Sequence, residues 1–307
     1  ISAGGTAPGG PDLLGLLVGS EGTLAVITRV LVRLLELPAS VDTIAASFDS
    51  VEHANAGATD LLLAGILPAA LEVMDRTTVQ AVDAKFKIGY PPGAGAILLA
   101  ELHDELGGAN QLAGETADLL HRAGARTLRR AADSEESELL WTSRQRAISA
   151  LAAIRPNFYL HDGVVPRSRL PELLRAVDAI GREYRIPIAS TLHAGEGTLH
   201  PTLLYDARDQ GAGAVVAEAG DLIALECVRA GGTLSGEHGI GTDRRAAMLL
   251  QFDPGDLAAM AAVKRALDPA GILNPGKVLP SELGAGDRGR ADLPPPRVGE
   301  TEGAEWW

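Results

Sequence analysis

Strand-like and helical patterns alternate along most of this chain, and the alternation constrains the fold more than any other feature. Runs rich in β-branched and other apolar residues predict strands, while apolar positions three and four apart predict helices. The predicted strands cover residues 43–48, 69–74, 96–102, 126–130, 188–192 and 203–205, and the predicted helices cover 51–64, 77–87, 108–123, 134–153, a segment ending at 184, 214–230 and 254–267. Because repeated signatures of parallel crossovers are missing, we expect an α+β fold with helices flanking a largely antiparallel sheet.

Composition shifts divide the chain into three predicted parts. Residues 1–38 form a small unit with a glycine-rich loop and a β-rich run at 23–33, and residues 39–280 form the main domain. Residues 281–307 are rich in Gly, Asp, Arg, Glu and Pro, which predicts a flexible tail. A start at Ile1 within a glycine-rich loop predicts the truncated product of a longer chain.

Charge and composition exclude several classes of protein. The net charge of −13, with only four lysines and dispersed arginines, argues against a nucleic-acid partner. No apolar run approaches the ~18 residues of a membrane span, so a soluble protein is expected. The single cysteine, Cys227, can form no internal disulfide, which predicts a reducing compartment, most simply the cytoplasm. Its apolar helical setting makes it a poor nucleophile.

Two glycine-framed segments hold the residues best suited to chemistry, His193–His200 and Ser235–Gly241. Gly195, Gly197 and Pro201 disfavour a helix around the first segment, so we expect a strand, a tight loop and a second apolar run. Two neutral imidazoles plus one carboxylate form a common first shell for Zn²⁺, Mn²⁺ or Fe²⁺. The candidate metal ligands are His193, His200 and Glu237.

Glu237 is followed directly by His238, and neighbours in a regular strand point to opposite faces. Gly236, Gly239 and Gly241 would bend the backbone so that Glu237 takes the metal while His238 faces the substrate. The alternative is that these are polar loop residues satisfied by backbone hydrogen bonds.

Other polar residues give weaker signals. Arg144 and Arg146, in the helix after an acidic start, could clamp a carboxylate bidentately or form a solvated face. His161, before Asp162-Gly163, could edge the pocket, and three other histidines are expected to be solvated. These are His53, His103 and His121.

The loop Gly19-Ser-Glu-Gly22-Thr23 could cradle a phosphate with backbone N–H groups or could form an ordinary turn. It is not a Rossmann fingerprint, because the spacing G-x-G-x-x-G is absent.

Four motifs in order resemble the FAD-linked oxidases of the vanillyl-alcohol-oxidase type, in particular the branch of the glycolate oxidase D-subunit and the D-lactate dehydrogenases. They are the Gly19-Ser-Glu-Gly-Thr-Leu run, His193-x6-His200, Ser235-Gly-Glu-His-Gly-Ile-Gly and Leu273-Asn-Pro-Gly-Lys-Val. The resemblance spans residues 1 to about 280 and implies that residues 1–38 are the C-terminal remnant of an FAD-binding domain.

The resemblance also implies roles for individual residues. It implies FAD contacts from Gly19, Ser20, Glu21, Gly22, Thr23, Val26 and Asn274, a divalent metal on His193, His200 and Glu237, and His238 as the base. The implied reaction is oxidation of a D-2-hydroxy acid, with an iron–sulfur partner and with peripheral association with the inner membrane through that partner. Ile148 and Leu160 stand where relatives that act on 2-hydroxyglutarate have Thr and Lys, which favours a small substrate. The chain departs from the family at Ala25 and at Glu196-Gly-Thr198, where Gly and Asp-Gly-Asn are usual.

Two other functions remain open from the residues alone. A His2Glu site with an open position also activates water in flavin-free hydrolases. A non-catalytic fragment or subunit that docks onto a partner is the second alternative.

Overall fold

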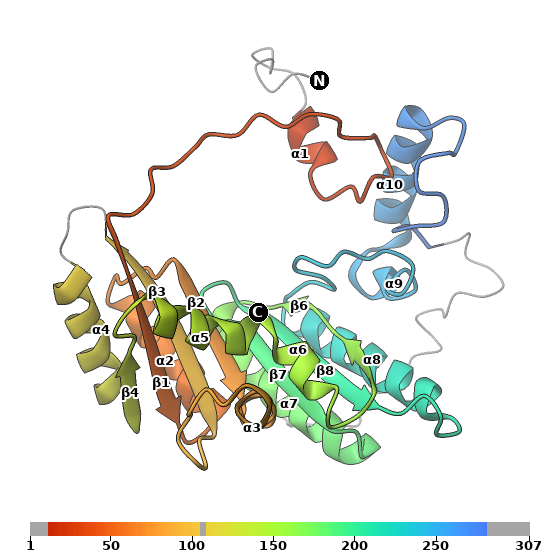
Figure 1. Ribbon diagram of the computed structural model, residues 1–307. Coiled ribbons are helices and arrows are strands. Elements are labelled where there is room, and N and C mark those ends of the chain that lie inside the picture. Colours follow the sequence, from red (N-terminus) through yellow and green to blue (C-terminus); the bar gives the residue numbers. More distant parts are fainter. Residues whose placement is uncertain (1–11, 105–108, 281–307) are drawn as a thin grey trace, which may run out of the picture. The chain divides into compact units, whose positions relative to one another are not determined.

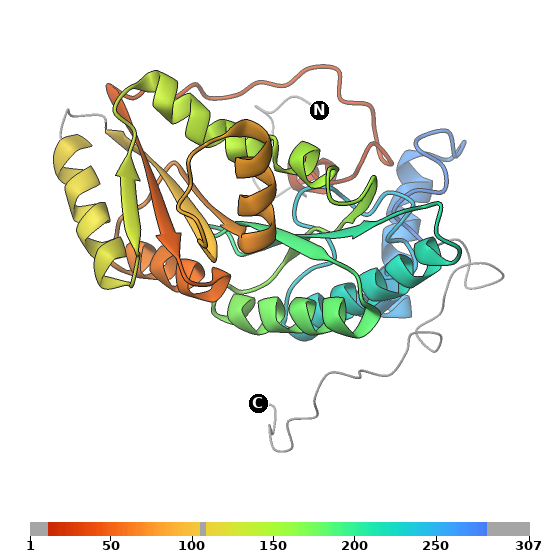
Figure 2. The same ribbon diagram turned by 60° about the horizontal axis from the view of Figure 1, so that its bottom comes forward.

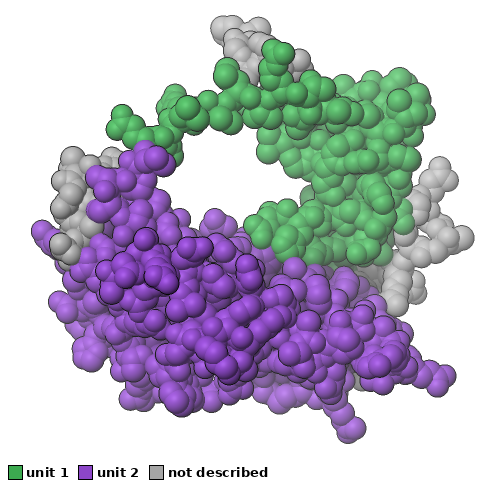
Figure 3. All heavy atoms as spheres, viewed as in Figure 1, with its two compact units in different colours: residues 1–36, 233–294 green, residues 37–232, 295–307 purple. Residues whose placement is uncertain are grey.

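A computed structural model describes residues 12–104 and 109–280 of the chain (Figure 1). Among these residues, 12–36 and 233–280 form one compact unit, unit 1, and 37–232 form another, unit 2 (Figure 3). The predicted parts divided the chain differently, since residues 233–280 group with the N-terminal segment and not with the main domain. The predicted tail, 281–307, lies outside the described residues.

Unit 2 is built on one eight-stranded antiparallel sheet, which confirms the prediction of a largely antiparallel sheet. The strands are β1 (Ser40–Phe48), β2 (Ala70–Asp75), β3 (Ala96–Asp104), β4 (Thr127–Arg130), β5 (Asn157–Leu160), β6 (Gly163–Val164), β7 (Ile188–His193) and β8 (Thr198–Tyr205). Their order is β4-β1-β3-β2-β7-β8-β5, and β6 also pairs with β8. The short strands β5 and β6 were not predicted, because two to four residues carry too little periodicity.

Helices cover both faces of this sheet (Figure 2). One face, the α2–α7 face, packs against α2 (Val51–Leu63), α4 (Ala109–Arg122), α7 (Leu170–Tyr184) and α8 (Ala212–Arg229). The other, the α3–α5 face, packs against α3 (Arg76–Phe86), α5 (Ser134–Gln145) and α6 (Ala147–Leu151). A short 3-10 helix, η1 (Arg167–Arg169), precedes α7.

Strand β3 shows why both faces are apolar. Leu98, Ala100 and Leu102 enter the core of the α2–α7 face, while Ile97 and Leu99 enter that of the α3–α5 face. Alternate residues of a strand point to opposite sides, so a continuous apolar run is buried on both. Burial of apolar area stabilises a fold by about 25 cal/mol per Å², so such strands stabilise unit 2 from both faces.

The predicted helix 134–153 is interrupted in the structure. α5 ends and α6 begins at Arg146, whose backbone (φ −103°, ψ 15°) leaves the helical region. Arg146 is neither Gly nor Pro, so the residue type at this position does not predict the break. Among the described helices, each is too short or too polar to traverse a bilayer.

Unit 1 contains α1 (Leu13–Leu17), α9 (Met248–Gln251) and α10 (Pro254–Leu267). Lys264 of α10 joins its segments, because Nζ donates to the carbonyl oxygens of Thr23 (2.7 Å) and Leu273 (2.6 Å) and pairs with Asp268. The β-rich run at 23–33 forms no strand. Residues 25–38 are extended but pair with no strand of the described chain, and their apolar side chains are exposed.

Candidate active site

Unit 2 brings two of the predicted metal ligands together. His193 ends β7 and His200 lies in β8, and their ring centroids are 4.9 Å apart with the rings nearly perpendicular at 89°. In the register of these strands, Thr191 faces His200 and His193 faces Thr198. Both imidazoles therefore project from the α3–α5 face, as diagonal neighbours. The prediction of strand, tight loop and strand is confirmed, although β8 starts earlier than expected.

Gly197 makes the tight connection possible. Its φ of +91° is in the region that favours glycine, and a Cβ here would lie 2.4 Å from the carbonyl oxygen of Val165. Its amide and that of Glu196 both donate to the carbonyl oxygen of His193. The glycine thus closes the turn and fixes where the two histidines meet.

A buried carboxylate that the sequence analysis missed holds the first histidine. Glu72 of β2 lies opposite His193 in the sheet, and its Oε1 is 2.6 Å from His193 Nδ1. Its other oxygen, Oε2, accepts from Nε of Arg144 at 2.8 Å. Burial alone would raise the pKa of Glu72, but the hydrogen bond from His193 and the charge of Arg144 outweigh it and leave the pKa below its usual value.

The donor set in unit 2 fits a divalent metal. When Nδ1 of His193 donates to a carboxylate, the lone pair of the ring is on Nε2, which is the usual arrangement of a metal-bound histidine. His200 is buried, with its Nδ1 3.8 Å from a carboxylate oxygen of buried Asp162. Each imidazole thus has a carboxylate beside it.

The other predicted residues of unit 2 are placed clearly. His161 is buried next to Asp162. Its backbone amide donates to the carbonyl oxygen of Pro201, which follows His200 in β8. Arg144 joins the pair through Glu72, whereas Arg146 is exposed at the end of α5. The three histidines expected to be solvated are exposed: His53, His103 and His121. Cys227 is buried in α8.

Glu237 and His238 lie in unit 1, in a loop without regular structure. The two side chains are neighbours, with Glu237 Oε1 3.3 Å from His238 Nε2. Gly239 and Gly241 adopt positive φ angles of 84° and 53°, as the glycine-rich motif predicts. The roles of Glu237 as metal ligand and of His238 as base remain predictions.

Most of the residues predicted to contact FAD lie around Glu21, also in unit 1. The Glu21 carboxylate accepts the amides of Ile240 (2.7 Å) and Gly241 (2.8 Å), and its carbonyl accepts from Asn274 Nδ2 at 2.6 Å. Gly22 has φ +68°, and a Cβ there would lie 2.7 Å from Asn274 Nδ2. The structure therefore joins the glycine loop, the Glu-His loop and Asn274.

The glycine loop has features that fit a cofactor. Gly19 (φ +80°) has open space where a Cβ would stand, so a ligand can approach the main chain. The loop also borders a largely apolar cavity of about 430 Å³ lined by α1 and α10. Val26 lies outside this cluster, exposed on the extended segment.

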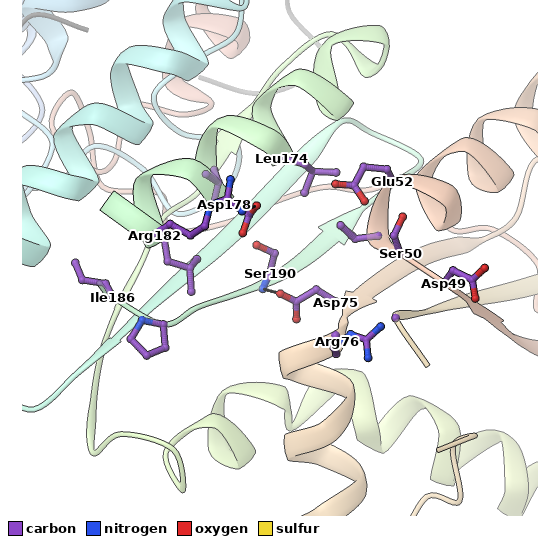
Figure 4. Close-up of a pocket in the computed structure, with 16 residues that line it drawn as sticks. Asp49, Ser50, Glu52, Asp75, Arg76, Leu174, Asp178, Arg182, Ile186 and Ser190 are labelled. Carbon is purple, nitrogen blue, oxygen red and sulfur yellow. Dashed lines mark hydrogen bonds and ion pairs between the residues drawn. The ribbon is translucent and has the colours of Figure 1, made fainter. Parts of the chain in front are cut away.

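A separate cavity of about 420 Å³, lined by polar and apolar residues alike, opens on the α2–α7 face of unit 2 (Figure 4). Asp75, at the end of β2, accepts the amides of Ser190 (2.8 Å) and Thr78 (2.8 Å) at its rim. Alternation along β2 puts Asp75 on the side of the sheet away from Glu72. None of the predicted site residues lines this cavity.

Comparison with known families decides the class of the protein. Residues 37–278 match the family described as FAD linked oxidases, C-terminal domain. The chain belongs to the FAD-linked oxidases. The match covers the whole described part of unit 2 and most of the C-terminal part of unit 1, and it confirms the resemblance drawn from the four motifs.

Curated relatives point to one branch of the FAD-linked oxidases. The chain is 40% identical to the glycolate oxidase subunit GlcD of Escherichia coli (strain K12), covering 94% of this chain and 59% of the relative. It is 35% identical to the subunit of the same name in Bacillus subtilis (88% and 57%) and 32% identical to a probable mitochondrial D-lactate dehydrogenase of Danio rerio (88% and 54%). The chain thus spans somewhat over half the length of these relatives.

Solved structures support the fold of this FAD-linked oxidase. The 4-ethylphenol oxidase of Gulosibacter chungangensis aligns with a TM-score of 0.62 at 17% identity, covering 80% of this chain and 55% of that one. p-Cresol methylhydroxylase aligns with a TM-score of 0.60 at 13% identity, covering 78% and 53%. At such identities the likeness concerns the fold alone.

Proposed function

We propose that the chain is the substrate-binding part of a flavoenzyme that oxidises a small D-2-hydroxy acid, such as glycolate or D-lactate, to the 2-oxo acid. The family supports FAD as the cofactor, and the names of the relatives support the substrate class. The observation that carries the proposal is the arrangement in unit 2 in which one buried carboxylate, Glu72, holds both His193 and Arg144.

Arg144 binds the substrate carboxylate in this proposal. Its Nε is bonded to Glu72, so the two terminal amino groups are the pair that can grip a carboxylate bidentately. Ile148 of α6 and Leu160 of β5 offer no second positive charge, which supports a substrate with a single carboxylate.

His193 and His200 hold a divalent metal (Zn, Mn or Fe), with Glu237 as the third ligand. The first two roles are supported by the geometry of unit 2, and the third by the glycine-framed motif. A bound cation would lower the pKa of the substrate hydroxyl, and FAD would supply the two-electron oxidation as the acceptor of a hydride from Cα.

His238 takes the hydroxyl proton as the hydride leaves Cα, so the alcohol loses a proton and a hydride and becomes the ketone or aldehyde. An imidazole is suited to this transfer because histidine is the side chain that most often acts as a general base. The main chain of Gly19–Thr23 and the side chain of Asn274 contact FAD in the proposal, while the Glu21 carboxylate holds that loop in place.

The chain is also proposed to assemble with other subunits. Two relatives are named subunits of glycolate oxidase, which supports assembly with partner chains. An iron–sulfur subunit that receives the electrons, and peripheral association with the inner membrane through it, follow from the resemblance of the motifs. A cytoplasmic location is proposed for the chain itself.

Anaerobic stopped-flow measurement of flavin reduction by glycolate or D-lactate tests the function. In the full flavoenzyme, His238→Ala should slow reduction by about 100-fold or more, the usual contribution of a general base. His121→Ala, on the exposed side of α4, is the control and should reduce its flavin at the wild-type rate. Unchanged reduction in His238→Ala would remove the assigned base, and wild-type flavin that neither acid reduces would remove the substrate class.

A further inference from the structure

We infer that Glu72 is a positioning residue that sets two functional side chains at once, the ring of metal ligand His193 and the guanidinium of Arg144. The inference rests on the proposed function and assigns a role to a residue outside the predicted site. Glu72 touches neither substrate nor cofactor in this assignment, and acts through the two residues that do.

The position of Glu72 in the sheet makes the geometry rigid. β2 is an inner strand, paired with β3 on one side and with β7 on the other, and Glu72 lies opposite His193 in this register. The side chain is only 11% exposed, and each oxygen has its own donor: His193 Nδ1 at 2.6 Å and Arg144 Nε at 2.8 Å. A carboxylate held on an inner strand by two charge-assisted bonds has little freedom to turn.

Energetics argue that this carboxylate is not there for stability. Its side chain is buried on the α3–α5 face of an inner strand, and a carboxylate there costs several kcal/mol of desolvation unless it is paired. An apolar residue would serve the core of the α3–α5 face at least as well. The arrangement is therefore better explained by what Glu72 does for its two donors.

The two bonds have different consequences. The bond to Nδ1 fixes the His193 tautomer whose Nε2 can bind a cation, and it stops the ring from rotating. The bond to Nε of Arg144 fixes the plane of the guanidinium, which turns its two terminal amino groups into an oriented pair. One residue thus sets the metal ligand and the substrate clamp at a constant separation.

Two binding measurements on Glu72→Gln separate these effects. Glutamine keeps the shape and one acceptor oxygen, but its amide group would face a donor. We expect the dissociation constant for Zn²⁺, titrated alone into the apo-protein by chelator competition, to rise about 10- to 100-fold. At saturating Zn²⁺, the KM for the hydroxy acid in the flavoenzyme should still be raised about 10-fold, because Arg144 loses its anchor.

Matched variants make the pattern specific. Arg144→Lys should raise KM but leave zinc affinity within about 2- to 3-fold of the wild-type value, since Arg144 does not touch His193. Glu101→Gln removes another carboxylate–histidine pair of the same sheet, with His103 at 2.8 Å, and should change neither quantity. Glu72→Asp keeps the charge with a shorter stem and should recover part of both losses, with circular dichroism checking that each variant folds.

Nitrogen-15 NMR of histidine-labelled protein gives a readout independent of activity. The His193 signals, assigned with His193→Gln, should show a proton on Nδ1 in the wild type and an altered tautomer in Glu72→Gln. A folded Glu72→Gln protein with wild-type zinc affinity, KM and His193 tautomer would overturn the role of Glu72 alone. A wild-type protein that binds no zinc would overturn the proposed metal site and this role together.

Discussion

Glu21 accepts the backbone amide of Ile240 at 2.7 Å, which joins residues more than two hundred positions apart in the chain. The same carboxylate accepts the amide of Gly241 at 2.8 Å. A carboxylate would repel the phosphates of a nucleotide, so this contact explains how an acidic residue can stand in a loop that is proposed to bind FAD.

Removal of the Glu21 carboxylate should loosen unit 1. Glu21→Ala leaves two amides without their charged acceptor and should lower the free energy of unfolding by about 1–3 kcal/mol. Glu21→Gln keeps one acceptor oxygen and should lose about half as much. Urea denaturation measures the loss, and faster hydrogen exchange at Ile240 and Gly241 locates it. Glu36→Ala, on the exposed extended segment, is the control, and an equal loss there would contradict the assignment.

Lys264 should be the most sensitive lysine of unit 1. Lys264→Met keeps the aliphatic stem but removes the donor to Thr23 and Leu273 and leaves buried Asp268 without its ion pair. We expect a loss of about 2–4 kcal/mol in the free energy of unfolding, measured by urea denaturation. Lys277→Met, at an exposed position, should lose less than about 0.5 kcal/mol. Equal effects in the two variants would show that the Lys264 bonds do not stabilise unit 1.

Gly197→Ala should disturb the histidine pair through the backbone. The substitution combines a positive φ with a Cβ 2.4 Å from the Val165 carbonyl oxygen. We therefore expect the free energy of unfolding to fall by about 2–4 kcal/mol and zinc binding to weaken. Gly124→Ala isolates the first effect, because φ is +95° there but no atom lies within 4 Å of the added Cβ. Gly124→Ala should lower the free energy of unfolding by about 1 kcal/mol. Thermal unfolding and zinc titration compare the two, and equal losses would show that the clash is relieved.

Asp75 should make the stability of unit 2 depend on pH. Burial raises its pKa to about 6, although the amides of Thr78 and Ser190 donate to the carboxylate. A raised pKa means that the folded state binds the proton more tightly than the unfolded state, whose pKa is near 3.8. The stabilising effect is therefore complete below about pH 4 and is lost as the pH rises to about 6, by at most about 3 kcal/mol.

Asp75→Asn tests this pH dependence because it cannot titrate. The free energy of unfolding of the variant minus that of the wild type should rise between pH 4 and pH 7, as the wild type alone loses stability. Urea denaturation at several pH values measures the difference, with the exposed Asp118→Asn as the matched control. A difference independent of pH would show that Asp75 ionises in the folded state as easily as in the unfolded one.

The sequence predicted the ends of an element correctly where residues near those ends set them. Helix 254–267 has the predicted bounds because Asp253 and Asp256 form a capping box and Pro254 fits the first turn. The β-rich run at 23–33 forms no strand, because β-propensity says nothing about whether a partner strand is available. Pairing is a property of the tertiary structure.

The candidate site was also predicted only in part, because some of its residues have a local signal and others do not. Glycines around His193 and His200 marked them as loop-framed ligands, and the structure brings their rings together. Glu72 was missed because it stands alone in an apolar strand, where periodicity assigns it to the core. The available signal was this isolation, since a carboxylate in a buried run needs a partner, but only the β2–β7 register identifies His193 as that partner.

That register ties the proposed metal site to correct folding. A slip of β7 by one residue against β2 would turn His193 to the opposite side of the sheet and leave Glu72 facing an apolar neighbour. A chain folded with such an error would keep its helices and most of its strands yet lose the proposed cation site. Zinc retention could therefore serve as a quality test for refolded or engineered versions of this protein, sensitive to a mistake that overall helix and strand content would hide.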